Sequence, residues 1–229
     1  MNPDQVRAVL PLTAEPPPTA HADAVLAQIS ASYFRLRCGM AVLAIAFPLV
    51  LWIGGGVGHL QASISDYYHY HGGRLRDVFV GVLWALGAFL FFYRGYSRGE
   101  DRALNLAGVA AVVIALFPDD YPASAPATWI GRLHGAAAIG FFLLIAYVCV
   151  FRSGDTLAVL ADVARRHAFL RTYRVLGLLM VALPLSVTAL RFAWPGLRVA
   201  TFLMEVAGIW TFAAFWLVKS REIALIERQ

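Results

Sequence analysis

Long apolar runs separated by short polar segments dominate this sequence. A helix needs about 20 residues to cross roughly 30 Å of hydrocarbon, and six runs approach that length, at about 38–57, 78–93, 103–117, 133–151, 175–192 and 199–218. A backbone in lipid must satisfy its own hydrogen bonds, and none of the runs alternates with the two-residue period of a strand. The pattern therefore predicts an all-α bundle of six transmembrane helices within residues 38–222.

The two ends of the chain differ from this membrane domain. Residues 1–21 contain Pro16-Pro17-Pro18 and show no apolar periodicity, whereas Ala22–Arg37 alternates apolar and polar residues at helical spacing. Together, residues 1–37 predict a disordered cytoplasmic tail followed by an interfacial lead-in helix. Residues 223–229 predict a short cytoplasmic tail.

Small residues four positions apart occur inside three of the apolar runs. This spacing lets helix backbones approach closely in lipid. The pairs are Gly81 with Ala85, Ala107 with Ala111, and Ala136 with Gly140.

Composition and charge fix the expected environment and orientation. The chain is 60% hydrophobic and only 14% charged, with a net charge of +5, which excludes an ordinary soluble domain. Most of the 19 Lys and Arg residues fall in segments that share one side if both termini are cytoplasmic, as the positive-inside rule requires. No basic and aromatic nucleic-acid module is present, so no nucleic-acid partner is expected.

One polar and aromatic connector, Gln61–Asp77, lies between the first two runs and, in this orientation, faces outward. Polar residues from other connectors and spans share its depth. Glu205 lies seven residues past Arg198, which puts it about 10 Å below the outer boundary, so it is expected to face the bundle interior. The outer set comprises Ser65, Asp66, His69, His71, Asp77, Asp119, Asp120, His134 and Glu205. We expect no comparable set at the inner end.

Three kinds of chemistry could use this outer set, and the sequence leaves all three open. Asp66, His134 and Glu205 could ligate a divalent metal, although no HxxxH or HExxH spacing occurs. His134 as base, Glu205 as acid and Ser65 as nucleophile could act on an ester. The same groups could instead be structural, with Asp66 and Asp77 as caps and Glu205 paired to His134 or Arg76.

The remaining polar and aromatic residues of these connectors are candidates for contact with a headgroup. An interfacial aromatic belt explains the tyrosines Tyr67, Tyr68 and Tyr70 at least as well as a headgroup platform does. The candidate binding set comprises Tyr67, Tyr68, His69, His71, Arg76, Asp77, Asp119 and Asp120.

Several short motifs resemble the DRAM/Frag/Sfk family of six-span membrane proteins. They are Ile64-Ser65-Asp66, Arg76-Asp77-Val-Phe79, Ala88-Phe-Leu90, Leu133-His134-Gly135-Ala136, and Glu205 ahead of an aromatic-rich run. The chain is also similar to bacterial six-span proteins of unknown function, which implies a multi-pass protein of the bacterial inner membrane. Some members of the family are linked to lipid remodelling and others to scaffolding. The resemblance implies that Asp66, His134 and Glu205 form the shared site.

Sequence and resemblance together predict a polar outer-leaflet pocket that binds or processes a lipid or lipid-linked headgroup by acyl transfer or hydrolysis. One alternative is a non-catalytic membrane organiser that recruits a partner through its basic cytoplasmic loops. A second is a small-solute transporter, which the expected lack of an inner polar half-site disfavours. The expected partners are membrane lipid and either a second copy of the chain or another membrane protein.

Overall fold

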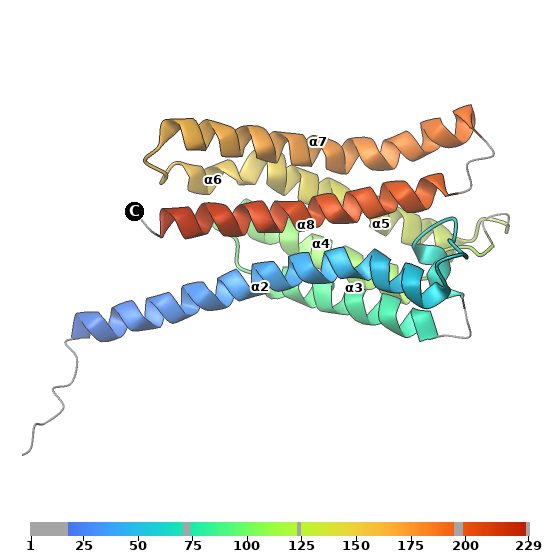
Figure 1. Cartoon of the computed structure of the whole chain (residues 1–229), viewed down its shortest axis with the longest axis horizontal. Coiled ribbons are helices and arrows are strands. Elements are labelled where there is room, and N and C mark those ends of the chain that lie inside the picture. The colour runs from blue at the N-terminus through green and yellow to red at the C-terminus, as the bar shows by residue number, and fades with distance from the viewer. Residues whose placement is uncertain (1–17, 71–73, 123–124, 195–198, 228–229) are drawn as a thin grey trace, which may run out of the picture. The chain divides into compact units, whose positions relative to one another are not determined.

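The computed structural model describes residues 18–70, 74–122, 125–194 and 199–227, and these residues form helices joined by short connectors, without a strand (Figure 1). The predicted tail at residues 1–17 and the candidate His71 lie outside the described residues. The long helices are α2 (Pro18–Gly55), α3 (Arg74–Phe92), α4 (Arg98–Leu116), α5 (Trp129–Tyr147), α7 (Val163–Ala193) and α8 (Ala200–Ile226). Three short elements are the 3-10 helix η1 (Ser65–Tyr68), the π-helical turn η3 (Val148–Arg152) and α6 (Gly154–Leu157). The all-α prediction is confirmed.

Within the described residues, five helical segments are long and apolar enough to cross a membrane: His21–Gly55, Arg74–Phe92, Trp129–Leu157, Val163–Ser186 and Ala200–Ile226. Helix α4 is not among them, because its first turn carries Glu100, Asp101 and two arginines. Large apolar side chains are exposed on the helices, including Phe92 at 77%, Leu185 at 67% and Leu178 at 66%. Water solvates such apolar surfaces poorly, whereas lipid solvates them well. The chain therefore has the character of a membrane protein.

The chain divides into two compact units, Met1–Leu36 and Arg37–Gln229. In the first unit, the described residues belong to the beginning of α2 and are mostly exposed. The predicted lead-in helix is thus helical, and it continues into the first apolar run without a break, with Pro48 inside the same helix. The second unit contains all the other elements.

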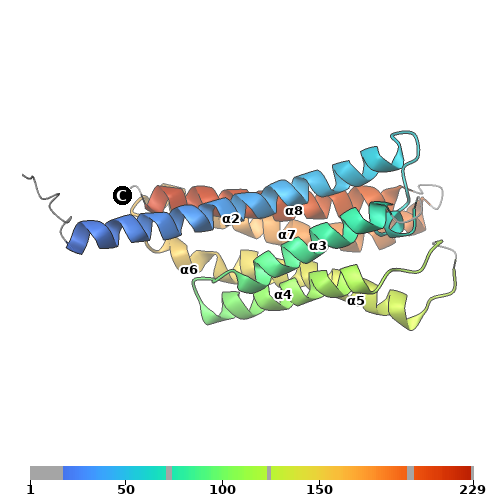
Figure 2. The same ribbon diagram turned by 90° about the horizontal axis from the view of Figure 1, so that it is seen from below.

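Within the second unit, helices that follow one another along the chain pack side by side. Helix α4 packs against both α3 and α5, α7 packs against α8, and α5 packs against α7. The part of α2 in this unit contacts α3 through the rings of Phe47 and Phe79, 5.6 Å apart, and α8 through a hydrogen bond from Trp210 Nε1 to the Ile45 carbonyl. The α2–α3 and α4–α5 connectors and the start of α8 gather at one end, here called the connector end (Figures 1 and 2). The opposite end, where α8 finishes, is the C-terminal end.

Helices α3 and α4 approach most closely at a pair of glycines. A β-carbon on Gly87 would lie 2.8 Å from the Gly108 carbonyl oxygen, and one on Gly108 would lie 2.5 Å from the Gly87 carbonyl oxygen. Only glycine fits at either position. The predicted contacts at Gly81 and Gly140 are wrong, because a β-carbon there would meet nothing within 4 Å.

Candidate functional site

The connector between α2 and α3 is attached to the start of α8 by hydrogen bonds from three donor groups. The Ala62 carbonyl accepts from Phe202 N at 2.9 Å, which satisfies one of the amides that a helix leaves unpaired in its first turn. Glu205 accepts from Ser63 Oγ at 2.8 and 2.9 Å and from Ile64 N at 2.7 Å. Glu205 faces the interior as predicted, but its partners are in the connector and are neither His134 nor Arg76.

Asp66 shapes the same connector from within. Its Oδ2 accepts from Ser63 N at 3.1 Å, while Ser65 N donates to Ser63 Oγ at 3.1 Å. Asp66 is 4% exposed, so these bonds are shielded from water. The aspartate therefore stabilises the turn that presents Ser65, as the structural interpretation expected.

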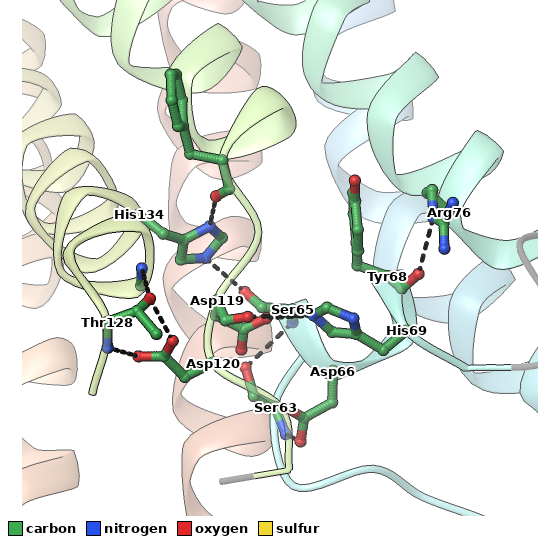
Figure 3. Close-up of polar contacts among 12 residues, drawn as sticks. Ser63, Ser65, Asp66, Tyr68, His69, Arg76, Asp119, Asp120, Thr128 and His134 are labelled. Atoms are coloured by element: carbon green, nitrogen blue, oxygen red, sulfur yellow. Dashed lines mark hydrogen bonds and ion pairs between the residues drawn. The ribbon is translucent and has the colours of Figure 1, made fainter. Parts of the chain in front are cut away.

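Ser65 forms a hydrogen bond to a histidine on a different helix, α5. Its Oγ lies 2.9 Å from His134 Nε2, and His134 Nδ1 lies 2.8 Å from the carbonyl oxygen of Phe117 (Figure 3). A carbonyl can only accept, so the neutral ring carries its proton on Nδ1 and its Nε2 accepts from the serine hydroxyl. A histidine held in this tautomer is placed to take the proton of the serine, which is how serine nucleophiles are activated.

The sequence offered Ser65 and Glu205 as possible partners of His134, and of these two it is Ser65 that forms the hydrogen bond. Two features position His134. Helix α5 begins at Trp129 with Thr128 as its N-cap, whose side chain accepts from Gly131 N at 3.1 Å. Helix α4 ends at Leu116, which brings the Phe117 carbonyl against the imidazole. Both Ser65 and His134 are buried, at 9% and 5% exposed.

The two neighbouring aspartates of the α4–α5 connector have different surroundings. Asp120 accepts from Thr128 Oγ1 at 2.6 Å and from Thr128 N at 3.0 Å, and these bonds lower its pKa (Figure 3). Burial, with a smaller contribution from the charge of Asp66, raises the pKa of Asp119 to about 6. Asp119 Oδ1 lies 3.6 Å from His69 Nε2, whose closer partner is the Asp119 carbonyl oxygen at 3.1 Å.

The polar groups line one open cavity of about 470 Å³ at the connector end. Its lining includes six predicted site residues, namely Ser65, Asp66, Asp119, Asp120, His134 and Glu205, and no Lys or Arg among the described residues. Two buried oxygens in the lining, Asp119 Oδ1 and Thr201 Oγ1, have no hydrogen-bond partner in the described part of the chain. Buried polar atoms are rarely left so, and a polar ligand in the cavity would supply the missing partners.

Other predicted binding residues lie away from this cavity. Tyr67 is fully buried, with its ring 6.2 Å from that of Phe202, so it belongs neither to an aromatic belt nor to a headgroup platform. Arg76 is exposed and lies over the Tyr68 ring at 4.9 Å, and Asp77 is exposed too. Neither Arg76 nor Asp77 lines the cavity.

The predicted metal set does not come together as a ligand group. Across the described ranges, no three His, Cys, Asp or Glu side chains are grouped closely enough to hold a metal ion. The possible ligand atoms already form hydrogen bonds within the protein, since His134 Nε2 faces Ser65 and both oxygens of Glu205 accept from Ser63.

A second buried polar cluster lies at the C-terminal end, and the prediction that this end has none is wrong. Lys219 Nζ donates to Thr156 Oγ1 at 2.6 Å and to Glu222 Oε2 at 3.2 Å, and Glu222 also accepts from Thr156 and from the Tyr173 hydroxyl. Lys219 and Glu222 are both 0% exposed. Nearby, buried Arg37 donates to the Tyr93 hydroxyl at 3.3 Å.

These residues were missed because Lys219 and Glu222 resemble the start of a solvated tail. The signal that could have found them is periodicity, since they continue the stripe of Phe212, Phe215 and Trp216 at helical spacing. The cluster removes the reason for disfavouring a transporter. Its charged groups are nevertheless satisfied by one another, which is the arrangement of a structural ion pair.

Comparison with protein-family models, with curated proteins and with solved structures finds no match for this chain.

Proposed function

We propose that this chain is a membrane-embedded serine esterase or acyltransferase that acts on an ester carried by a lipid or lipid-linked headgroup. The observation that carries the proposal is the pairing of Ser65 Oγ with His134 Nε2, on a ring held in the accepting tautomer by the Phe117 carbonyl. Ser65 would be the nucleophile and His134 the general base, while Asp66 and Glu205 position the connector.

The reaction needs no group beyond an ester and an acceptor. Ser65 Oγ attacks the ester carbonyl as its proton passes to His134 Nε2. The carbon–oxygen bond to the alcohol then breaks, and His134 returns the proton to the departing oxygen. Water or a second alcohol, deprotonated by His134, attacks the acyl-serine and releases Ser65. Hydrolysis and acyl transfer differ only in which of the two enters.

The residues that line the cavity of about 470 Å³ indicate which kind of alcohol the ester substrate carries. Four carboxyl groups, those of Asp66, Asp119, Asp120 and Glu205, line this cavity, with no Lys or Arg among the described lining residues. An anionic phosphate headgroup would meet unfavourable charge there, whereas a neutral polyol or a cationic headgroup would not.

The setting of the site is also part of the proposal. We include α4 as a span in addition to the five segments given above, which makes six spans with both termini in the cytoplasm. This arrangement would put the connector end at the outer face of a bacterial inner membrane. Packing of α4 between α3 and α5 supports a span for this helix despite its charged first turn. The short motifs around Ser65, His134 and Glu205 support kinship with the DRAM/Frag/Sfk family.

The proposal is tested by ester hydrolysis with the purified chain in nanodiscs of phosphatidylethanolamine and phosphatidylglycerol. A panel of p-nitrophenyl esters of different chain lengths serves as substrate, with Ser65→Ala and His134→Gln as variants. Each variant should lose about 10²–10⁴-fold in rate at equal folded protein. His59→Gln, on an exposed histidine of the same connector, should keep the wild-type rate.

Three other outcomes would count against catalysis. Hydrolysis that is equal in all four proteins would show that the pair does no chemistry. Loss of folded protein in Ser65→Ala and His134→Gln would favour a structural pair. Normal folding with no hydrolysis of any ester in the wild type would favour the membrane-organiser alternative.

A further inference from the structure

Two cavities of different character share Ser65 and His134 in their linings. One is the open polar cavity of about 470 Å³, and the other is an apolar cavity of about 80 Å³ deeper in the bundle. Both are lined by Ser65, Ala138, His134, Phe142 and Glu205. The serine and histidine therefore stand in the wall between them, with a different environment on each side.

The deeper cavity is walled almost entirely by hydrocarbon side chains. They come from five helices of the second unit and include Phe47, Phe79, Leu83, Leu86, Ile114 and Phe212. Apart from Ser65, His134 and Glu205, no lining residue carries a polar side chain. An apolar cavity of this kind is unfavourable for water and favourable for an alkyl group.

We propose that this apolar cavity is the acyl site of the enzyme and that it restricts the substrate to esters of short acyl chains, about two to four carbons long. The inference rests on the proposed function. An ester bound at Ser65 would place its acyl group in the apolar cavity and its alcohol in the polar one. Ser65 Oγ would bond to the acyl carbon, and the alcohol would leave into the polar cavity with the proton from His134.

The chain length follows from the volume. An apolar cavity of about 150 Å³ accommodates benzene, which has six carbons. A cavity of about 80 Å³ is roughly half that size and so has room for about three or four carbons. Longer chains would have to displace the packed rings of Phe141 and Phe212, whose centroids are 5.5 Å apart. Rearranging a close-packed core is costly.

A substitution at Ala138 would change the apolar cavity most directly. Ala138 lies one helical turn from His134 on α5 and lines both cavities. A larger side chain at this position would reduce the space beside Ser65 in both cavities. Leu83 lines the apolar cavity but not the polar one. A shorter side chain at this position would therefore enlarge the acyl site without changing the polar cavity.

The test is the dependence of kcat/KM on acyl length, with p-nitrophenyl acetate, butyrate, octanoate and palmitate and the chain in nanodiscs. Wild type should favour acetate and butyrate over octanoate by at least about 10-fold, because one methylene in an apolar site discriminates by about that much or more. Ala138→Leu should lower kcat/KM for butyrate more than for acetate. Leu83→Ala should raise kcat/KM for octanoate relative to kcat/KM for butyrate. Ala136→Leu, at an exposed position on the same helix, should leave the profile unchanged.

The outcomes separate this inference from the proposed function. Hydrolysis that depends on Ser65 but is equal for all chain lengths, or fastest for palmitate, would overturn the acyl site and leave the esterase intact. A short-chain preference that Ala138→Leu and Leu83→Ala do not change, with both variants folded, would also overturn it. Absence of hydrolysis at every length would overturn the proposed function and this inference together.

Discussion

Ser65 Oγ lies 2.9 Å from His134 Nε2, although 69 positions separate the two residues in the chain. The serine is presented by a connector attached to α8, and the histidine is oriented by Phe117, the C-cap residue of α4. Three segments must therefore be in place before the two atoms can meet. This dependence makes the pair a sensitive reporter of how the connector end is assembled.

Removal of the Glu205 carboxylate should loosen the connector. Glu205→Ala leaves Ile64 N and Ser63 Oγ without their acceptor, which should lower the free energy of unfolding by about 1–3 kcal/mol. Glu205→Gln, which keeps one acceptor oxygen, should be less damaging. Thermal unfolding in detergent measures both. Thr201→Val, which removes a hydroxyl without a partner in the described chain, is the control and should cost little or nothing.

A Glu205→Ala protein as stable as Thr201→Val would show that these hydrogen bonds do not hold the connector.

Asp119 should make stability depend on pH in a defined window. Burial raises its pKa from 3.8 to about 6, with Asp66 adding to the effect, so between these values the folded state holds a proton that the unfolded state has lost. Stability should therefore fall, on the order of 1 kcal/mol or more, as pH rises from about 4 through about 6. His69, Asp120 and Glu205 are the other titratable neighbours of Asp119.

Thermal unfolding of wild type and Asp119→Asn between pH 4 and 7.5 tests this dependence. The asparagine variant should decline less than wild type over this range and should be the more stable protein at pH 7. Asp120→Asn should instead be less stable than wild type at pH 7, because hydrogen bonds from Thr128 lower the pKa of Asp120 and favour its charged form. Identical pH profiles for wild type and Asp119→Asn would show that the carboxyl titrates normally.

The helices could be predicted from the sequence, whereas the contacts between connectors could not. Apolar runs locate α3, α4, α5 and the start of α8 to within a few residues, because lipid requires continuous apolar length, but α8 continues past the predicted run to Ile226. The depth argument for Glu205 also predicts correctly that it faces inward, since an exposed carboxylate at that depth is unfavourable. Its partner Ser63 follows from how the connector folds over α8, which no local pattern encodes.

Buried charge near a helix end is the harder case for sequence reasoning. Lys219 and Glu222 are charged residues close to a terminus, and such residues are usually solvated. Their burial depends on Thr156 and Tyr173, which other helices bring to the same place. Which glycines form a close helix contact also depends on how the helices pack against one another. In this protein they are Gly87 and Gly108, and not Gly81 or Gly140.

The buried ion pair at the C-terminal end should be important for stability and sensitive to removal of one partner. Lys219→Met leaves Glu222 buried without its cation, which should cost about 3–5 kcal/mol. The double variant Lys219→Met with Glu222→Gln should cost less than the sum of the two single changes. Arg221→Gln, between them but exposed, should be close to neutral. Additive effects of the two single changes on the unfolding temperature would show that the pair is not coupled.

The orientation of the chain is testable with two matched valines. Val57, in the α2–α3 connector, is 62% exposed, and Val159, between α6 and α7, is 64% exposed. In a Cys38→Ser background, a membrane-impermeant maleimide added to intact bacterial spheroplasts should label Val57→Cys and not Val159→Cys. Both should react after the membrane is permeabilised. The reverse labelling would place the connector end in the cytoplasm.

The most direct measurement of the central claim is covalent labelling of Ser65. Purified protein in nanodiscs is treated with diisopropyl fluorophosphate, and the modified peptide is identified by mass spectrometry. A serine activated by His134 should form one adduct, located on Ser65, that is absent in Ser65→Ala and strongly reduced in His134→Gln, and retained in His59→Gln. No adduct on Ser65, or an adduct that forms equally well without His134, would contradict the assignment of this pair as a catalytic centre.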